Sequence, residues 1–73
     1  MNKTIFTESH KRLVAKLVKA RRNVKLRQVD AARKLGRTQS YVSKIESGQR
    51  RIDTVQLKEF ARLYKKKIDF FFE

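Results

Sequence analysis

Apolar residues recur at helical spacing near the start of the chain. Leu13, Leu17, Ala20 and Val24 follow one another at intervals of four, three and four residues, which is the pattern of one buried face on a helix. Thr7 precedes this stretch and is a competent N-cap, because its hydroxyl can accept from a backbone N–H that has no partner in the first turn. The pattern predicts a first helix over about residues 8–22.

A second helical pattern, with apolar residues at intervals of three, covers residues 27–35. Arg27 cannot cap this helix with its side chain, although Asp30 in the first turn partly compensates. Gly36 follows at once, and glycine accepts the left-handed conformation that commonly ends a helix. We therefore expect the second helix to stop at this glycine.

A third helix is expected directly after Gly36. Thr38 can cap its N-terminus, Val42 and Ile45 lie three residues apart on an inward face, and Gly48 can end it. The opposite face consists of Gln39, Ser40, Ser43 and Lys44. Amide, hydroxyl and ammonium groups contact base edges and phosphates in DNA complexes, but a solvated helix surface has the same composition. Taken alone, this helix leaves both interpretations open.

The last third of the chain predicts a fourth helix from Thr54 to about Tyr64. Asp53 and Gln56 have the spacing of a capping box. The inward positions of this helix are Val55, Leu57, Phe60, Ala61 and Tyr64. Residues 68–72 then form either a single helical turn or an extended tail. Because no strand pattern of useful length occurs, the sequence predicts an all-α fold, a compact bundle of four to five short helices.

The length of 73 residues fits one small domain, which we place at residues 7–73 after a short N-terminal arm of residues 1–6. Cysteine is absent and His10 is the only histidine, so neither disulfides nor a zinc site can stabilise the fold. The core must come from packed helices. We see no constellation of catalytic residues, and we expect no enzymatic activity, no cofactor and no metal.

The formal net charge of +13, from 20 basic and 7 acidic residues, predicts attraction to polyanions. Most of this positive charge lies in the first half of the chain. DNA, RNA and an anionic membrane surface all remain possible partners on charge alone. The apolar stripe of the first helix is modest for a membrane-surface helix, and no long apolar run suggests a transmembrane segment or signal peptide. We expect a soluble, cytoplasmic protein without a membrane partner.

A recognisable pattern of residue types spans the second and third predicted helices. Its members are Leu26, Gln28, Ala32, Lys34, Leu35, Gly36, Gln39, Ser40, Val42, Ser43, Ile45, Glu46 and Gly48. The pattern resembles the helix-turn-helix family that includes lambda-type phage repressors, their Cro partners and Xre-like bacterial regulators. Weaker resemblance extends over about residues 13–71. It implies a lambda-repressor-like DNA-binding domain of bacterial or phage origin, acting at the nucleoid, with the helix-turn-helix at about residues 27–47.

The sequence departs from the family pattern at a few positions. Arg27 replaces the usual Thr or Ser cap, and Ala31 replaces a larger aliphatic residue. Lys25 and Lys65 stand where turn glycines are common, and Arg37 occupies an often apolar site. These departures bear on local helix stability more than on DNA binding.

The resemblance also implies where DNA would bind. In this family the helix that begins near Gln39 enters the major groove of double-stranded DNA. The expected base-reading residues are Gln39, Ser40 and Lys44, with Ser43 and Tyr41 as less certain members. The expected phosphate contacts are Gln28, Arg27, Arg37, Thr38, Gln49, Arg50 and Arg51. A solvated charged loop is the alternative interpretation for Arg27, Arg37, Gln49, Arg50 and Arg51.

Two further expectations concern structure and assembly. The resemblance implies a structural ion pair between Arg21 and Glu46 that braces the first helix against the third. A small domain reads few base pairs, so we expect a homodimer at least on DNA, with a contact in the C-terminal segment of residues 65–73. The candidates for this contact are Tyr64, Ile68, Phe70, Phe71 and Phe72, although the core could consume them.

The leading hypothesis is a sequence-specific transcription regulator, most simply a repressor. A second hypothesis is an antitoxin or another protein-interaction module with a small protein partner, which binds DNA for autoregulation. A third is a non-specific RNA or nucleoid-type binder, which requires charge alone.

Overall fold

The computed structural model describes residues 7–73, so the predicted N-terminal arm over residues 1–6 lies outside the described residues. The described chain folds into four α-helices and a 3-10 helix. They are α1 (Glu8–Asn23), α2 (Gln28–Leu35), α3 (Gln39–Glu46), α4 (Thr54–Leu63) and η1 (Ile68–Phe72). The predicted all-α bundle is confirmed, and the open alternative for residues 68–72 is settled as a 3-10 turn.

Side-chain caps fix where three of the helices begin. The Thr7 hydroxyl accepts from the backbone N–H of His10 at the start of α1, and the Thr38 hydroxyl accepts from that of Tyr41 at the start of α3. Before α4, the predicted capping box is present, since Asp53 and Gln56 each accept from the backbone N–H of the other. The boundaries predicted from these residues therefore hold to within about a residue.

Left-handed turns end α1, α2, α3 and α4. Gly36 has a φ of 71° and Gly48 a φ of 82°, as their positions after α2 and α3 predicted. Lys25 and Lys65 adopt the same conformation, with φ values of 59° and 60°. Lysine has a Cβ that this conformation crowds, so the two turns carry strain that glycine would avoid.

The buried core draws on every helix. It consists of Leu17, Ala20, Ala31, Ala32, Tyr41, Val42, Ile45, Leu57, Phe60, Ala61, Tyr64 and Phe71. The small side chains of Ala31 and Ala32 are fully or almost fully buried where α2 lies against α3. Val55, which the sequence pattern placed inside, is instead exposed. It is the second residue of α4, and the first buried residue of that helix is Leu57, two positions later.

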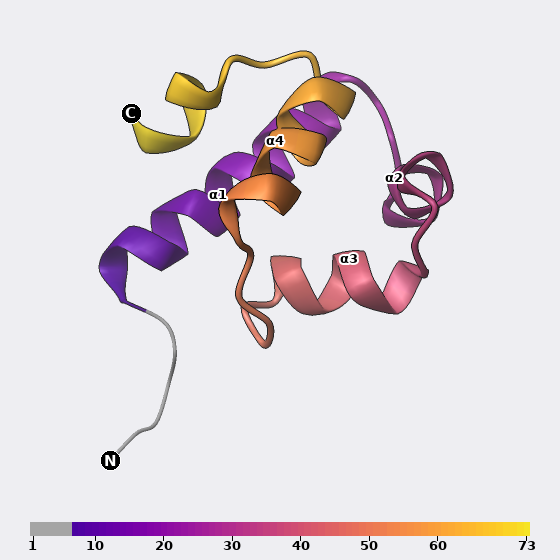
Figure 1. The fold of residues 1–73 in the computed structure, drawn as a ribbon, viewed down its shortest axis with the longest axis horizontal. Coiled ribbons are helices and arrows are strands. Elements are labelled where there is room, and N and C mark those ends of the chain that lie inside the picture. The colour runs from indigo at the N-terminus through magenta and orange to yellow at the C-terminus, as the bar shows by residue number, and fades with distance from the viewer. Residues whose placement is uncertain (1–6) are drawn as a thin grey trace.

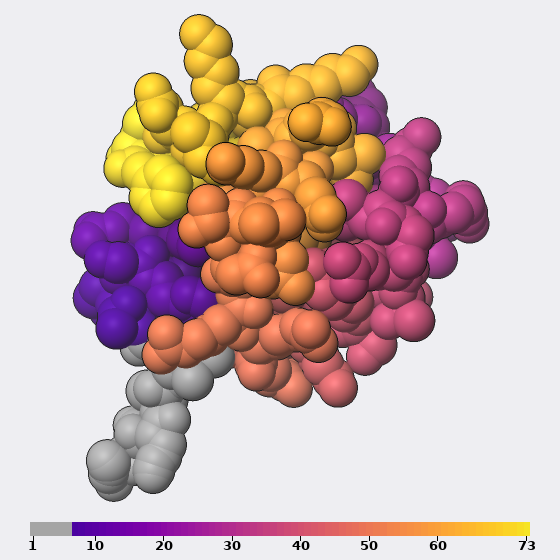
Figure 2. All heavy atoms as spheres, in the orientation of Figure 1, coloured from indigo at the N-terminus to yellow at the C-terminus, as the bar shows by residue number. Residues whose placement is uncertain are grey.

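The helices are arranged so that α3 lies at one edge of the molecule (Figure 1). Helices α1 and α4 occupy the middle, with α2 and α3 on one side and η1 on the other. The space-filling view shows the loop after α3 and the start of α4 covering the centre of one face, between α3 and the beginning of α1 (Figure 2). Within residues 7–73, no helix is long and apolar enough to cross a membrane.

Candidate nucleic-acid interface

Helix α3 presents a polar surface to solvent. Gln39, Ser40 and Lys44 are exposed and Ser43 is half-buried, and we call these four residues the outer face of α3. Val42 and Ile45 on the opposite side are buried in the core. The orientation predicted from spacing is therefore present, and the helix is held by an apolar side that leaves its hydrogen-bonding side chains free of the core.

The acidic group of α3 is withdrawn from this outer face. Both carboxylate oxygens of Glu46 accept from Arg21, at 2.7 Å from Nε and 3.0 Å from Nη2. Oε1 also accepts from Nε2 of Gln28 at 2.9 Å. The Arg21 and Glu46 side chains are only 11% and 7% exposed. A negative charge that would repel a phosphate backbone is thus neutralised inside the bundle.

The Arg21 guanidinium also connects α1 to the start of α2. Its Nη1 donates to the carbonyl oxygen of Leu26 at 2.8 Å, while its other nitrogens hold Glu46. The hydrogen bonds to Glu46 raise the pKa of Arg21 above its ordinary value, against the opposing effect of burial. This ion pair, which the family resemblance implied, fixes α3 to α1 and to the residues before α2.

The N-terminal end of α2 holds a second ion pair. Asp30 accepts from the backbone N–H of Arg27 and from its Nε, both at 2.9 Å, so the carboxylate supplies one half of a capping box, while the Arg27 side chain offers no acceptor for the other half. The Arg27 guanidinium beside it holds the pKa of Asp30 well below its usual range. The side chain of Gln28, an expected phosphate ligand, points instead to Glu46. Its side-chain amide is therefore engaged inside the bundle, and its backbone N–H lies in the first turn of α2.

Tyr41 requires a correction, because its side chain is 7% exposed and belongs to the core rather than to the outer face. Its ring stacks on Phe60 of α4, with centroids 6.2 Å apart and planes 7° from parallel. Burial raises the pKa of its phenol. The spacing contained this information, since Tyr41 precedes Ile45 by four residues and so shares its face.

Two of the expected phosphate-binding arginines meet at this tyrosine. The guanidinium carbons of Arg37 and Arg50 lie 4.9 Å and 5.0 Å from the centroid of the Tyr41 ring. Arg37 is also 3.9 Å from a carboxylate oxygen of Glu59. No local sequence pattern indicates that these two arginines share a ring, because the whole of α3 separates them.

Arg51, although adjacent to Arg50, takes a different direction. It lines a hollow beside the start of α1, together with Thr7, His10 and Phe72. Arg50 and Arg51, which the sequence analysis gave the same role, therefore lie on different surfaces of the protein. Gln49 is exposed in the same loop, and Thr38 is exposed but already uses its hydroxyl as the cap of α3.

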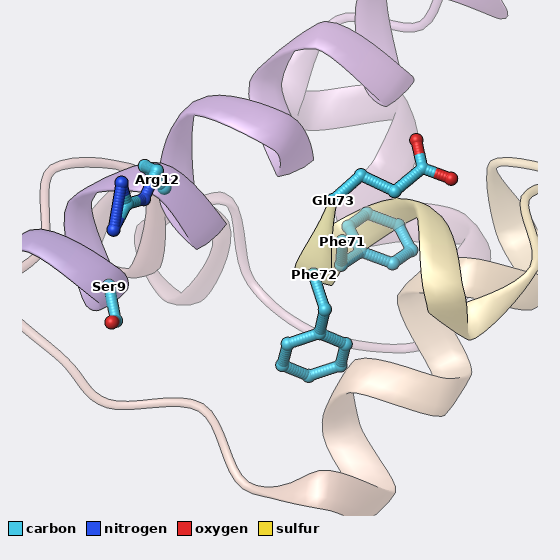
Figure 3. A pocket seen from close by; sticks show the side chains of 5 residues that line it. All are labelled: Ser9, Arg12, Phe71, Phe72 and Glu73. Carbon is cyan, nitrogen blue, oxygen red and sulfur yellow. The ribbon is translucent and has the colours of Figure 1, made fainter.

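The expected dimer contact is also corrected in part. Tyr64 and Phe71 are core residues, and burial raises the pKa of the Tyr64 phenol. Ile68 and Phe70 pack partly against the core, and the ammonium groups of Lys16 and Lys66 each lie 4.7 Å from the centroid of the Phe70 ring. Phe72 alone of the five is largely exposed, at 69%. Figure 3 shows its ring directed away from that of Phe71, across from Ser9 and Arg12 of α1.

A comparison with protein-family models matches residues 17–71 to a model described as helix-turn-helix. The chain belongs to this family. The match is of the Cro- and lambda-repressor-like, Xre type, as the residue pattern indicated. Searches of curated proteins and of solved structures returned no match.

The helix-turn-helix protein is thus a member of a DNA-binding regulatory family that is not generally enzymatic. In the part of the chain that the structure describes, no group of three or more His, Asp or Glu side chains could hold a metal ion. The matched region contains α2, the Gly36 turn and α3.

Proposed function

We propose that this helix-turn-helix protein is a sequence-specific transcription regulator, acting as a repressor, that binds double-stranded DNA at the nucleoid with α3 in the major groove. The observation that carries the proposal is the outer face of α3, which is exposed, rich in donors and free of accessible negative charge. An α-helix fits the width of the major groove, where each base pair presents a distinct pattern of donors and acceptors.

Gln39 and Lys44 are the proposed principal readers. A glutamine amide can bond to N6 and N7 of adenine, and a lysine ammonium to O6 and N7 of guanine, each worth about 1–3 kcal/mol of discrimination. Ser40 is exposed beside Gln39 and can serve a base or a phosphate, and Ser43 is available at the edge of the face. Tyr41 is not proposed as a reader, because its ring is in the core.

Phosphate contacts are proposed on both flanks of α3. On one flank, Arg27 and the first N–H groups of α2 lie near the end of α3, where Gln28 touches Glu46. On the other, Arg37 and Arg50 gather at Tyr41. Further contacts are proposed for Thr38 and Gln49, and Arg51 becomes a peripheral one. Such contacts position the protein on DNA without reading its sequence.

The regulator is proposed to bind as a homodimer on two half-sites about one helical turn apart. Phe72, with Ile68 and Phe70 beside it, is the surface proposed for the contact between copies. Sedimentation at micromolar concentration, with and without operator DNA, tests this assembly. A single copy on a full operator at saturation would refute it.

An alternative function is that of an antitoxin, which binds a small protein partner. The exposed Phe72, with Arg12 and Arg51 near it, would suit a partner with an acidic surface. Co-purification with a small protein encoded beside this gene would favour that alternative function. Retention of the partner by Phe72→Ser would exclude this surface as its site.

Selection from a random duplex pool tests the central proposal. We expect one enriched sequence, with two symmetric half-sites and a steep loss of affinity with added salt. Equal retention of all duplex sequences, or equal affinity for single-stranded RNA, would refute the specific-regulator function and favour the non-specific binder.

A further inference from the structure

We propose that Tyr41 is a positioning residue whose ring holds Arg37 and Arg50 together as one phosphate-binding pair beside α3. The inference rests on the proposed DNA-binding function. It adds a buried residue to that function, and it makes two cations from opposite ends of α3 a single unit.

The geometry brings the two arginines to one aromatic ring. Arg37 precedes the cap of α3, and Arg50 belongs to the loop after its C-terminal end. Each guanidinium carbon lies within 5.0 Å of the Tyr41 ring centroid, a distance at which a cation is attracted to the electron-rich face of an aromatic ring. The ring is therefore the shared support of both groups.

The ring itself is fixed by the core. Tyr41 is buried on α3 and stacks almost parallel to Phe60 of α4, which in turn contacts Tyr64 at a centroid distance of 5.7 Å. A planar group held on two helices has little freedom to move. The position of the guanidinium pair is consequently set by the α3–α4 packing and not by the loop that carries Arg50.

The electrostatic surroundings leave the pair available to an anion. Within residues 7–73, Arg50 forms no ion pair with a carboxylate, and the contact of Arg37 with Glu59 is long, at 3.9 Å, between half-exposed side chains. A phosphate can therefore replace Glu59 as the partner of Arg37 at small cost. Arginine side chains have high rotamer entropy, and a pair that is already ordered loses less of it when DNA binds.

Tyr41→Leu and Tyr41→Phe separate the ring from the hydroxyl. Within the described structure, the buried Tyr41 hydroxyl has no hydrogen-bond partner, so Phe keeps what the proposal requires and Leu removes it. Leu17→Ala is the control for lost core stability, because Leu17 is a buried residue of α1 that takes no part in the Tyr41–Phe60 stack or in either guanidinium contact. All variants are assayed on the selected operator at a temperature where urea unfolding shows each to be folded.

We expect Tyr41→Leu to weaken operator binding about fivefold or more, and Tyr41→Phe to bind within about twofold of the parent protein. Leu17→Ala should stay close to the parent protein once its folded fraction is accounted for. Equal weakening by Tyr41→Leu and Leu17→Ala would overturn the positioning role, because it would reduce the effect to lost core stability.

A second measurement needs no DNA and no variant. The Nε–Hε NMR signals of Arg37 and Arg50 should be shifted by the tyrosine ring current and should show restricted motion, whereas that of Arg51, the neighbouring control, should resemble a free arginine. The inference would be overturned if the signals of Arg37 and Arg50 were unshifted and as mobile as that of Arg51. If the signals are restricted but the parent protein selects no duplex sequence, the pair exists and the proposed function fails instead.

Discussion

The guanidinium of Arg21 and the carboxylate of Glu46 join α1 to α3 through two hydrogen bonds, across 25 positions of sequence. Both side chains are almost fully enclosed, and Gln28 completes the coordination of Glu46. This arrangement decides the orientation of α3 relative to the first helix. It also removes the acid of α3 from the surface that faces DNA in the proposed complex.

Removing one member of this pair should be costly. We expect Arg21→Met to lower the free energy of unfolding by about 3 kcal/mol, because Glu46 would be left as a buried charge with only Gln28 as a partner. Urea unfolding measures this loss. The double variant Arg21→Met with Glu46→Met should lose less than the sum of the single variants, and strict additivity would contradict a coupled pair.

Substitutions on the outer face of α3 should change sequence preference. Gln39→Ala and Lys44→Ala each remove a donor that is not needed by the core, so we expect normal stability and flattened discrimination among operator variants. Competition binding with single-base operator variants measures this. An unchanged preference order in both proteins would mean that another surface reads the bases.

Arg50→Ala and Arg51→Ala form a matched pair of charge losses in one loop. We expect Arg50→Ala to weaken binding to all duplex sequences alike and to reduce the slope of log affinity against log salt by about one unit. Arg51→Ala should have a smaller effect, because Arg51 points to the hollow beside α1. Titrations at several salt concentrations provide the comparison, and a larger slope change for Arg51→Ala would contradict the divergent directions of the two side chains.

Asp30 should make stability depend on pH in acid. Its pKa in the folded protein is depressed by Arg27 below the ordinary value of 3.8, so its contribution is complete above that value and is lost as pH falls toward the folded pKa. We expect Asp30→Asn to be less stable than the parent protein at neutral pH and the difference to shrink on acidification. Urea unfolding across this range tests it, and a constant difference would show that Asp30 acts only through its size or its neutral hydrogen bonds.

Replacing either lysine that has a positive φ by glycine should raise the stability of the fold. We expect Lys25→Gly and Lys65→Gly each to raise the free energy of unfolding by about 0.5 kcal/mol, because relief of the Cβ strain exceeds the greater entropy of glycine in the unfolded chain. Lys25→Ala is the control, since it removes the same positive charge and keeps the Cβ. If Lys25→Ala stabilised as much as Lys25→Gly in urea unfolding, charge repulsion and not strain would be the cause.

The sequence predicted the helices well because their signals are local. Thr38 and the Asp53–Gln56 pair mark helix starts through hydrogen bonds within one turn, and Gly36 marks an end through its own φ. Val42 and Ile45 could be placed inside from their spacing alone. These interactions span at most four residues, so the order of residues contains them.

The errors concern residues whose environment comes from distant parts of the chain. Tyr41 is buried because Phe60 of α4 covers it, and Phe71 is buried because η1 lies against α1. The direction of Gln28 depends on Glu46, 18 positions away. Arg50 and Arg51 are equivalent in composition but not in the neighbours that tertiary packing gives them. The spacing of Tyr41 and Ile45 did indicate the burial of Tyr41, but no local pattern could distinguish the other cases, because their partners meet only after folding.

Helices α2 and α3 have eight residues each, well below the roughly 12–15 residues that an isolated helix needs to be stable in water. Their formation therefore depends on the contacts with α1 and α4, and nucleation of either helix alone is unfavourable. A peptide of residues 37–50 would be a coil in solution, and the hydrogen-bonding side chains of the outer face of α3 would then have no fixed positions relative to one another. Operator binding and the folding equilibrium are consequently linked, and saturating DNA should raise the melting temperature of the whole domain.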